Sequence, residues 1–436
     1  MKRVLIISPH FPPINAPDMQ RIRMSLPYYR DLGWEAVVIA VRPEFVDGYV
    51  EEELLDTYPS YIEVHRVNAL PLKKTSKLGF GSLSIRSFFQ MMKKGNELLR
   101  ERRFDLVFFS TSTFHVCRLG PYWKKKFNVP FVIDMQDPWR NDYYLDKPKS
   151  ERPPKFWLAY NLDKKLEADT IPEAAGILSV SRGYIDILLN RYPSLVESNC
   201  KVLPFCASER DHEVATGLYT QGTDILPKDG NIHFVYAGRG GKDLRKAIEI
   251  IFSAIRILKI KHKELAERFR FTFVGTSYAA SGKGSKTILP VAKEFGLDHI
   301  VCEITDRLPF LKTLALLHDA DILIAPGSTD TSYTASKIYP YVLSEKPLLA
   351  VFNSNSSVVD LLRNLNFGEV VEFKNEDKAE VYSEQCAAKI LTLINMLTNK
   401  KVFLDKLKFA DYLAPHNAFE QVRFFEQLLS TSTDHS

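Results

Sequence analysis

The chain has 436 residues, of which 45% are hydrophobic and 25% charged, which is typical of a globular protein and excludes a disordered, collagen-like or coiled-coil chain. Its 58 basic and 53 acidic side chains leave a net charge of +5, too small to indicate nucleic-acid binding. The five cysteines are scattered, without a CxxC pair, and the longest apolar runs are too short to span a membrane; we therefore expect neither disulfides nor zinc, and a cytoplasmic location.

Short β-branched runs alternate with longer amphipathic runs in the first half of the chain. Buried parallel strands have nearly continuous apolar sequences, which predicts strands at 4–8, 36–41, 62–67, 106–110, 131–134, 177–180 and 202–205. Helical spacing predicts helices at 19–32, 84–102, 155–168 and 182–192. Alternating βαβ units imply a doubly wound parallel sheet, so residues 1–206 are predicted to form a Rossmann-like domain.

The same alternation restarts after a polar stretch with Gly and Pro over residues 207–230, which we interpret as a linker. Strands are expected at 232–237, 271–274, 300–303, 322–325, 348–352 and 370–373, and helices at 244–258, 288–295, 310–318, 358–364, 379–397, 403–413 and 418–429. Residues 231–412 therefore form a second Rossmann-like domain, and 413–436 a last helix expected to pack back on the first. Two such domains facing a cleft would bind ligands at the carboxyl ends of their strands.

Several cofactor motifs are absent from the sequence. The turn after the first strand, Pro9 to Pro13, has no glycine, whereas a dinucleotide site needs G-x-G-x-x-G there. The segment from Gly275 to Lys283 imitates a phosphate-binding P-loop but has six residues between its glycines where four are required. HExxH, GxSxG and metal-ligand clusters do not occur. We expect neither a cofactor nor a required metal.

The strongest chemical pattern opens the second domain. A strand is followed by Gly238, Arg239 and two further glycines, and then by a helix start that carries Lys242, Arg245 and Lys246. Helix amino termini and flexible glycines favour phosphate binding, and cations strengthen it. The alternative is a solvated helix start with surface cations, but those charges would oppose the helix dipole. We favour an anion site.

Polar residues also follow the predicted strand at 322–325. Thr334, Ser336, Lys337 and Tyr339 lie in this loop and the helix start after it, where hydroxyls and backbone N–H groups serve either a ligand or an ordinary helix cap.

In the first domain the positions after strands hold acids and histidines. Asp134 ends a strand and can serve as a cap or in an ion pair, whereas Asp137 lies past the strand end and is expected to face the cleft. His10 and His115 also follow strands, although a lone histidine is more often structural than catalytic.

Taken in order, these segments resemble a known family. FPPINAPDMQRIR, VPFVIDMQDPW, VYAGRGGKDLRKAI and SKIYPYVLSEKPLLAV are similar to segments of retaining, nucleotide-sugar-dependent GT-B glycosyltransferases of the glycosyltransferase group 1 family. The resemblance covers nearly the whole chain. It implies transfer of a sugar from a nucleoside diphosphate sugar to a glycan or lipid-linked acceptor hydroxyl with retention of configuration, without a metal.

The resemblance also assigns roles to residues. Arg239 and Lys246 (or Arg245) would neutralise the leaving diphosphate, with Asp137 as a further catalytic residue. The donor would contact Gly238, Lys242, Arg245, Thr334, Ser336, Lys337 and Tyr339, and the acceptor would contact His10, Arg21, His115 and Trp139.

One departure from the family pattern leaves other functions open. The family carries Glu-x7-Glu before its G-K-P strand, and the matching positions here are Ser332 and Pro340. Donor binding would then depend on Ser336, Lys337 and backbone groups. A non-catalytic nucleotide-sugar-binding or scaffold protein, or a GT-B sugar-nucleotide epimerase, would share the same architecture.

A basic, apolar segment over residues 73–103 gives a further hypothesis. Its cations, together with Phe and Met side chains, suit either an anionic membrane surface on the cytoplasmic side or an amphipathic helix that packs its apolar face on the core. We favour the second interpretation slightly.

Overall fold

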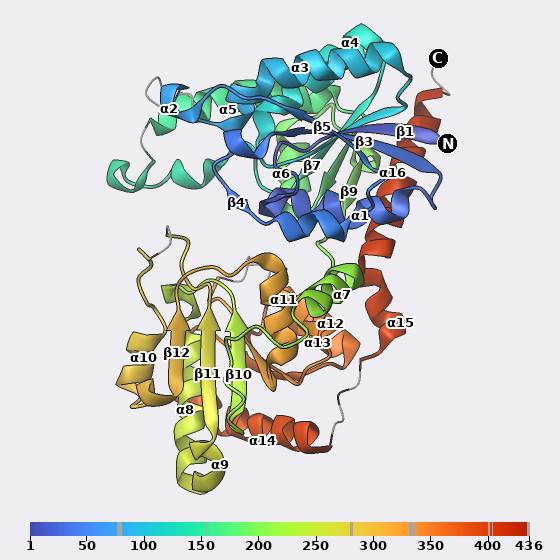
Figure 1. Ribbon diagram of the computed structural model, residues 1–436. Coiled ribbons are helices and arrows are strands. Elements are labelled where there is room, and N and C mark those ends of the chain that lie inside the picture. The colour runs from blue at the N-terminus through green and yellow to red at the C-terminus, as the bar shows by residue number, and fades with distance from the viewer. Residues whose placement is uncertain are drawn as a thin grey trace. The chain divides into compact units, whose positions relative to one another are not determined.

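The computed structural model describes residues 1–75, 81–153, 155–279, 282–330, 336–399, 402 and 404–433. The chain divides into two compact units (Figure 1). Unit 1 is formed by Met1–Phe205 together with Ala414–Ser436, and unit 2 by Cys206–Leu413. Each unit has a parallel sheet with helices packed against it.

The sheet of unit 1 has seven parallel strands in the order β5-β3-β1-β6-β7-β8-β9. The strands are β1 (Lys2–Ile7), β3 (Trp34–Val41), β5 (Glu63–Val67), β6 (Leu106–Ser110), β7 (Phe131–Met135), β8 (Gly176–Ser179) and β9 (Cys200–Val202). The helices are α1 (Gln20–Tyr29), α2 (Leu72–Thr75), α3 (Leu83–Glu101), α4 (Leu119–Phe127), α5 (Phe156–Thr170), α6 (Arg182–Arg191) and α16 (Ala414–Thr433). A short antiparallel pair, β2 (Ile14–Asn15) with β4 (Tyr49–Val50), lies apart from this sheet.

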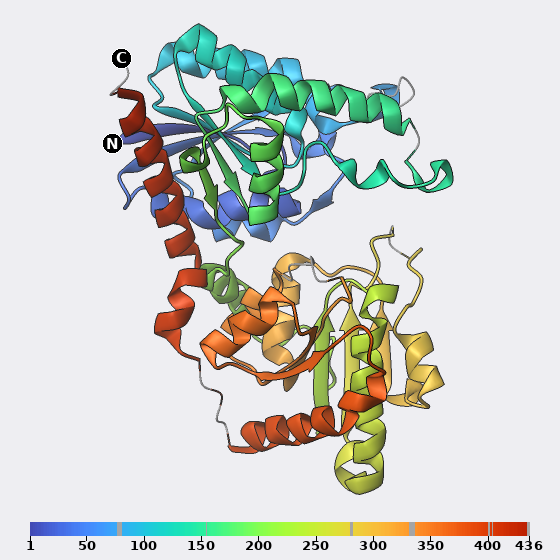
Figure 2. The ribbon, with the colours of Figure 1, turned by 180° about the vertical axis from the view of Figure 1, so that it is seen from behind.

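Two apolar clusters, one on each face of the sheet, hold unit 1 together. One joins alternate strand residues to α3 and α4, with Trp123 fully buried and stacked on Phe109. The other joins the remaining strand residues to α1 and α16, whose Phe425 packs on Phe108 and Trp34. Both views show α16, drawn in red, along unit 1 (Figure 2). The end of the chain therefore completes the core of the first unit.

The sheet of unit 2 has six parallel strands in the order β12-β11-β10-β13-β14-β15. They are β10 (Ile232–Ala237), β11 (Phe269–Val274), β12 (Val301–Ile304), β13 (Ile322–Pro326), β14 (Leu348–Asn353) and β15 (Glu369–Phe373). The helices are α7 (Glu209–Leu218), α8 (Arg245–Lys261), α9 (Lys263–Glu267), α10 (Leu289–Glu294), α11 (Phe310–Asp319), α12 (Ile338–Leu343), α13 (Ser357–Leu365), α14 (Ser383–Asn399) and α15 (Lys406–Phe409). This is the doubly wound α/β arrangement that the sequence predicted.

Every predicted strand overlaps an observed one, and two of the differences from expectation lie where unit 1 passes into unit 2. The last strand of unit 1 ends at Val202 instead of continuing to residue 205, because Pro204 lacks an N–H to give to a ladder. Residues 207–230, predicted as a linker, include α7, which belongs to unit 2. The Ser208 hydroxyl accepts a hydrogen bond from Asp211 N, 3.2 Å away, and so caps α7.

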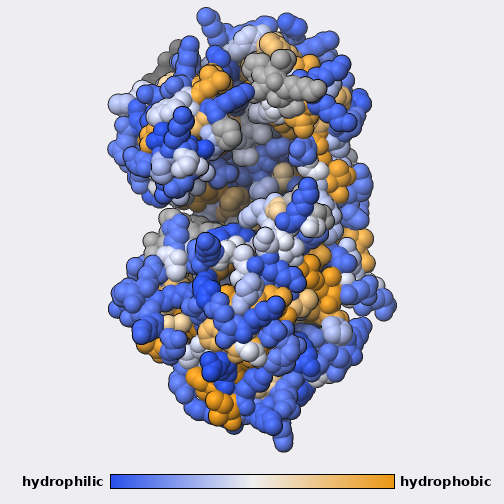
Figure 3. Space-filling view, turned by 90° about the vertical axis from the view of Figure 1, so that its left-hand side faces the viewer, coloured by the Kyte–Doolittle hydropathy of each residue, from blue (hydrophilic) through white to orange (hydrophobic). Residues whose placement is uncertain are grey.

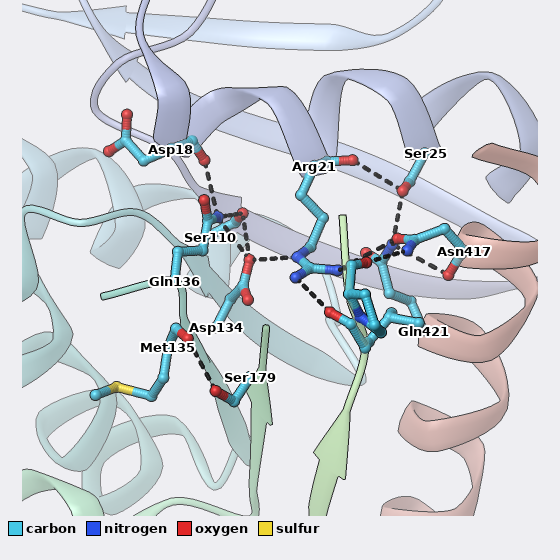
Figure 4. Close-up of polar contacts among 12 residues, drawn as sticks. Asp18, Arg21, Ser25, Ser110, Asp134, Met135, Gln136, Ser179, Asn417 and Gln421 are labelled. Atoms are coloured by element: carbon cyan, nitrogen blue, oxygen red, sulfur yellow. Dashed lines mark hydrogen bonds and ion pairs between the residues drawn. The ribbon is translucent and has the colours of Figure 1, made fainter. Parts of the chain in front are cut away.

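A buried arginine connects α1 to three other segments of unit 1. Arg21 is 1% exposed, and its Nε lies 3.0 Å from Asp134 Oδ2 on β7. Its Nη2 donates to Leu203 O at 2.7 Å, and its Nη1 lies 3.4 Å from Asn417 Oδ1 on α16 (Figure 4). The guanidinium is thus enclosed and committed to structural contacts, which contradicts the predicted contact of Arg21 with an acceptor.

Two histidines meet where α7 packs on α11 in unit 2. His212 Nδ1 lies 2.8 Å from His318 Nε2, and burial, reinforced by the charge of His318, lowers the pKa of His212 from 6.5 to about 3. Between those values the unfolded chain binds a proton that the folded protein does not, so the free energy of unfolding rises with pH, by up to about 1.4 kcal/mol per pH unit. Urea unfolding at pH 4, 5 and 7 measures this slope.

The slope is expected to shrink in His212→Gln and to persist in His262→Gln, which changes an exposed histidine. Lys346, Asp319 and Glu345 also act on His318, so the comparison of variants is more informative than the absolute slope. An equal slope in His212→Gln and the native chain would show that this pair does not carry the pH dependence.

Candidate functional site

The chain order of each sheet reverses at one point, and ligands bind at the carboxyl ends of strands beside such a reversal. In unit 2 the reversal lies between β10 and β13, and in unit 1 between β1 and β6. The glycine-rich loop after β10 and the loop after β13 therefore lie at the same edge of unit 2. His10 and Thr111 follow the two corresponding strands of unit 1.

Arg239 follows β10 and is held in a fixed orientation by a carboxylate. Its two terminal nitrogens lie 2.9 Å and 2.6 Å from the two oxygens of Asp243. The hydrogen bonds from Arg239, aided by one from the Ser328 hydroxyl, lower the pKa of Asp243 to about 2. Because Ser328 lies in the loop after β13, this contact joins the two loops at the sheet edge and positions the guanidinium.

Lys337 brings a second positive charge to the same place. Burial, together with the nearby charges of Arg307 and Arg239, lowers its pKa from 10.5 to about 8. Among the residues that the structure describes, none forms a hydrogen bond or ion pair with its ammonium group. Arg307, from the loop after β12, lies with its guanidinium 4.2 Å from the ring centre of Tyr278. Three cations from separate loops thus lie close enough for the charges of Arg239 and Arg307 to act on Lys337.

Gly238 explains how the lysine approaches the backbone. A Cβ at this position would lie 2.9 Å from Lys337 Nζ and closer still to the Tyr236 hydroxyl, so only glycine fits there. The Tyr236 hydroxyl donates to Arg239 O at 2.9 Å, and the Tyr341 hydroxyl accepts from Ala237 N at 2.7 Å. These hydrogen bonds hold the end of β10 in place. The three basic residues Arg239, Arg307 and Lys337 are called the cation cluster below.

The other predicted cations of this region point to different partners. Lys242 is exposed, and Arg245 pairs with Glu249 and with Glu294 on α10. Lys246 Nζ donates to the backbone carbonyls of Asn375 and Asp377. The structure thus brings Arg239 and Lys337 together, but it commits Arg245 and Lys246 to contacts within unit 2.

The remaining predicted donor residues divide into three cases. Ser332 and Thr334 lie outside the described residues. Ser336 is half-buried just before Lys337. Tyr339 is 7% exposed and stacks on Tyr412, with ring centres 5.6 Å apart, so its ring is largely used in packing.

In unit 1 the residue best placed for chemistry is His10. Its Nδ1 lies 3.1 Å from both carboxylate oxygens of Asp18, which is buried. Oδ2 of Asp18 also accepts hydrogen bonds from the Thr111 hydroxyl at 3.0 Å and from Ser112 N at 2.9 Å. The carboxylate is therefore fixed by the loop after β6 and in turn orients the imidazole.

The other predicted residues of unit 1 lie in different settings. Asp137 is accessible, and its pKa is raised by partial desolvation and by the charge of Asp18. Trp139 is 5% exposed and stacks on Phe114 at 5.6 Å, which leaves little of its ring for an acceptor. His115 uses both ring nitrogens, with Nε2 2.8 Å from Asp163 Oδ1 and Nδ1 3.3 Å from the Ser84 hydroxyl.

Sequence reasoning did not identify Asp18, Asp243 or Arg307. Asp18 and Asp243 each lie in a three-residue 3-10 helix without a recognisable motif, and Arg307 is one of many basic residues in the sequence. Their only signal was position, because each lies shortly after a strand that ends at the edge where ligands bind.

Residues 76–80 of the segment 73–103 lie outside the described residues, and the packing of α3 gives no support to the membrane hypothesis for the rest. The buried residues of α3 include Leu83, Met91 and Leu98, which face the core, although Phe89 is exposed. Within the described part of the chain no helix is long and apolar enough to cross a bilayer. The face of the molecule in Figure 3 is mainly hydrophilic, with apolar residues in small separate groups.

Lys337 is also expected to make anion binding depend on pH. It is charged below its pKa of about 8 and neutral above it, so affinity for a diphosphate is expected to fall as pH rises through that value. A bound anion favours the charged form, and binding near pH 8 to 9 should therefore take up a proton. Calorimetric titration with inorganic pyrophosphate in two buffers of different ionisation enthalpy measures this uptake; identical heats would contradict it.

Comparison with solved structures supports the architecture. Anabaena HepE in complex with UDP is 16% identical, and the match covers 100% of both chains with a TM-score of 0.54. An α,α-trehalose-phosphate synthase (UDP-forming) from Burkholderia xenovorans is 9% identical and covers 98% of this chain and 100% of its own, with a TM-score of 0.58. The chain has the GT-B fold. At these identities the GT-B likeness extends to the fold and no further.

Sequence comparisons add little to the GT-B assignment. No protein-family model matches the chain. A curated Chlamydia trachomatis protein, a UDP-N-acetylmuramoyl-L-alanyl-D-glutamate–2,6-diaminopimelate ligase, is 23% identical over 125 residues. That match spans 29% of this chain and only 23% of the ligase, so it does not indicate a shared activity.

Proposed function

We propose that the protein is a glycosyltransferase that moves a sugar from a nucleoside diphosphate sugar, bound by unit 2, to a hydroxyl of a saccharide or lipid-linked acceptor, bound by unit 1. The single observation that carries the proposal is the cation cluster. Lys337 lacks a described partner and has a lowered pKa, which suits a group that a bound diphosphate would neutralise. HepE, which shares the fold, is described in complex with UDP and with UDP-glucose.

The cluster supplies the chemistry that transfer needs at the donor. As the bond from the sugar to the diphosphate breaks, negative charge grows on the leaving oxygen, and fixed cations in a partly desolvated site stabilise it. Arg239 is fixed by Asp243, while Lys337 and Arg307 come from two other loops. We therefore propose transfer without a required metal, with these three residues in the role that the family resemblance assigned to Arg239 and Lys246.

A donor panel tests the proposal directly. UDP-, GDP- and dTDP-sugars are incubated with the protein, with and without EDTA, in the presence of saccharide acceptors, and products are detected by mass spectrometry. Glycosylated acceptor formed in EDTA supports a metal-independent transferase. Donor turnover without acceptor would indicate an epimerase or hydrolase, and binding without turnover would indicate a non-catalytic nucleotide-sugar-binding protein.

A further inference from the structure

Asp243 lies beside the cation cluster and brings a negative charge to a site proposed to bind an anion. We propose that Asp243 is a fixed counter-charge that weakens the hold of Arg239 on a diphosphate, and that it does so more for the released nucleoside diphosphate than for the intact donor. Asp243 thereby speeds the release of this product. The inference rests on the proposed glycosyl transfer and concerns unit 2 alone.

The first support is the contact between Asp243 and Arg239. Each carboxylate oxygen of Asp243 accepts a hydrogen bond from a terminal nitrogen of the guanidinium, at 2.9 Å and 2.6 Å. The two side chains are only partly exposed, at 33% for Asp243 and 21% for Arg239, so solvent screens their charges incompletely. A phosphate that approaches Arg239 therefore meets a cation whose charge is already partly neutralised, and the neighbouring carboxylate repels it.

The second support is that Asp243 is anchored independently of Arg239. Its Oδ2 accepts a hydrogen bond from the Ser328 hydroxyl at 2.7 Å, and its backbone carbonyl accepts one from Thr329 N at 2.9 Å. The side chain of Asn375 in turn donates to Thr329 O at 2.8 Å. The carboxylate is thus held by the loop after β13, which is itself held by the loop after β15. We therefore expect its charge to stay beside Arg239 when an anion binds.

The third support is the glycine that lies between the two charged residues in the chain. Gly241 has a φ of +152°, and a Cβ there would lie 2.6 Å from Asp243 Oδ1 and 3.1 Å from Arg239 Nη1. Any other residue would push the ion pair apart, and its backbone would also be strained. The turn therefore accommodates a carboxylate against the guanidinium, a charge pair that anion binding alone does not require.

The two nucleotide ligands of the proposed reaction differ in charge, which makes the counter-charge selective. A nucleoside diphosphate sugar carries about two negative charges, one on each phosphate. The released diphosphate carries about 2.5 to 3, because its terminal phosphate takes up a second proton only near pH 6. Repulsion by a fixed carboxylate grows in proportion to the charge of the ligand. Asp243 therefore lowers affinity for the product more than for the donor, and such affinity differences lie mainly in the dissociation rate.

Asp243→Asn tests the role of the charge, because the amide keeps an oxygen for the Ser328 hydroxyl or for Arg239. Calorimetry at neutral pH is expected to show that the variant binds UDP about 10- to 30-fold more tightly than the native chain, and UDP-glucose about 5- to 10-fold. The dissociation rate of a fluorescent UDP analogue, displaced by excess UDP in stopped-flow measurements, is expected to fall by about the same factor as the UDP dissociation constant.

Glu249→Gln is the matched control for the loss of a carboxylate. Glu249 lies on α8 and pairs with Arg245, outside the cation cluster, so we expect its loss to change UDP affinity by less than about twofold. Asp243→Ala is a second test, which removes the charge and the acceptor oxygen together. Because the charge is the feature that matters, both Asp243 variants are expected to bind UDP more tightly than the native chain. Thermal unfolding checks that each variant is folded.

The outcomes separate this inference from the proposed function. Weaker or unchanged UDP binding by the folded Asp243 variants, or equal gains for UDP and UDP-glucose, overturns the counter-charge while the donor site stands. An equal gain in Glu249→Gln also overturns it, because the effect would then belong to the net charge of the protein. Unfolding of both Asp243 variants would show a structural role and overturn it as well. A native chain that binds neither UDP nor UDP-glucose overturns the proposed function, and this inference with it.

Discussion

Lys337→Met is expected to weaken UDP binding by about 10- to 100-fold, since a charge-assisted contact to a phosphate contributes about 1.5 to 3 kcal/mol. The same change is expected to leave the melting temperature unchanged or raised. The native ammonium group is partly desolvated, it lacks a described partner, and the cations near it lower its pKa to about 8. Removal of an unfavourable charge should therefore not destabilise unit 2. Calorimetric titration and thermal unfolding of one preparation measure both effects.

Arg245→Met is the informative comparison for Lys337→Met. The glycine-rich motif made Arg245, like Lys246, a candidate for diphosphate binding. Its guanidinium instead pairs with Glu249 and Glu294. We therefore expect Arg245→Met to change UDP affinity by less than about threefold. A weakening as large as that of Lys337→Met would move the diphosphate to the start of α8. Unchanged affinity in Lys337→Met would remove the cation cluster as the donor site.

Arg21→Met is expected to lower the free energy of unfolding by about 3 to 5 kcal/mol, because it leaves the buried carboxylate of Asp134 without its ion pair. The change also removes the donors to the carbonyls of Leu203 and Pro204. Urea unfolding at pH 7 measures the loss. If Arg21 served an acceptor, the variant would instead keep its stability and lose only activity.

A double variant separates the ion pair from the carbonyl contacts. Arg21→Met with Asp134→Leu removes both charges, and we expect it to be more stable than Arg21→Met, because no buried charge is left unpaired. The exposed pair of Lys263 with Glu267 provides the control: Lys263→Met is expected to change the free energy of unfolding by less than about 1 kcal/mol. A loss of that small size in Arg21→Met would contradict a structural role.

The sheets were predictable because buried parallel strands carry a local signal. Val4 to Ile7, Phe131 to Ile133 and Phe234 to Ala237 are apolar on both faces, as expected for strands of a parallel sheet that is covered on both sides. α7 was missed because its ten residues bury only Asp211, His212 and Ala215, a pattern too weak to register as helical spacing. Its place in unit 2 depends on contacts with α11, which are remote in sequence.

The site was predictable only in part, and the reason is again distance along the chain. The motif at Gly238 and Arg239 was visible because glycine and cations adjoin a strand. The sequence did not show which cation lies beside Arg239, because Lys337 follows nearly one hundred residues later, whereas Lys246 follows only seven residues later. His10 was visible as a histidine after a strand, but Asp18 and Thr111, which make its geometry meaningful, became neighbours only on folding.

The amino-acid sequence by itself determined the two doubly wound sheets and the edge of each at which polar loops gather, because apolar periodicity and glycine placement act over a few residues. The tertiary structure decided which charged side chains form contacts within the protein and which remain available to bind a ligand. Arg21 and Lys246 are satisfied by carboxylate and carbonyl groups brought from distant segments, while Lys337 and His10 Nε2 are left without partners in the described chain. Whether a charge or lone pair is satisfied depends on all of its neighbours in space, and a local pattern contains only a few of them.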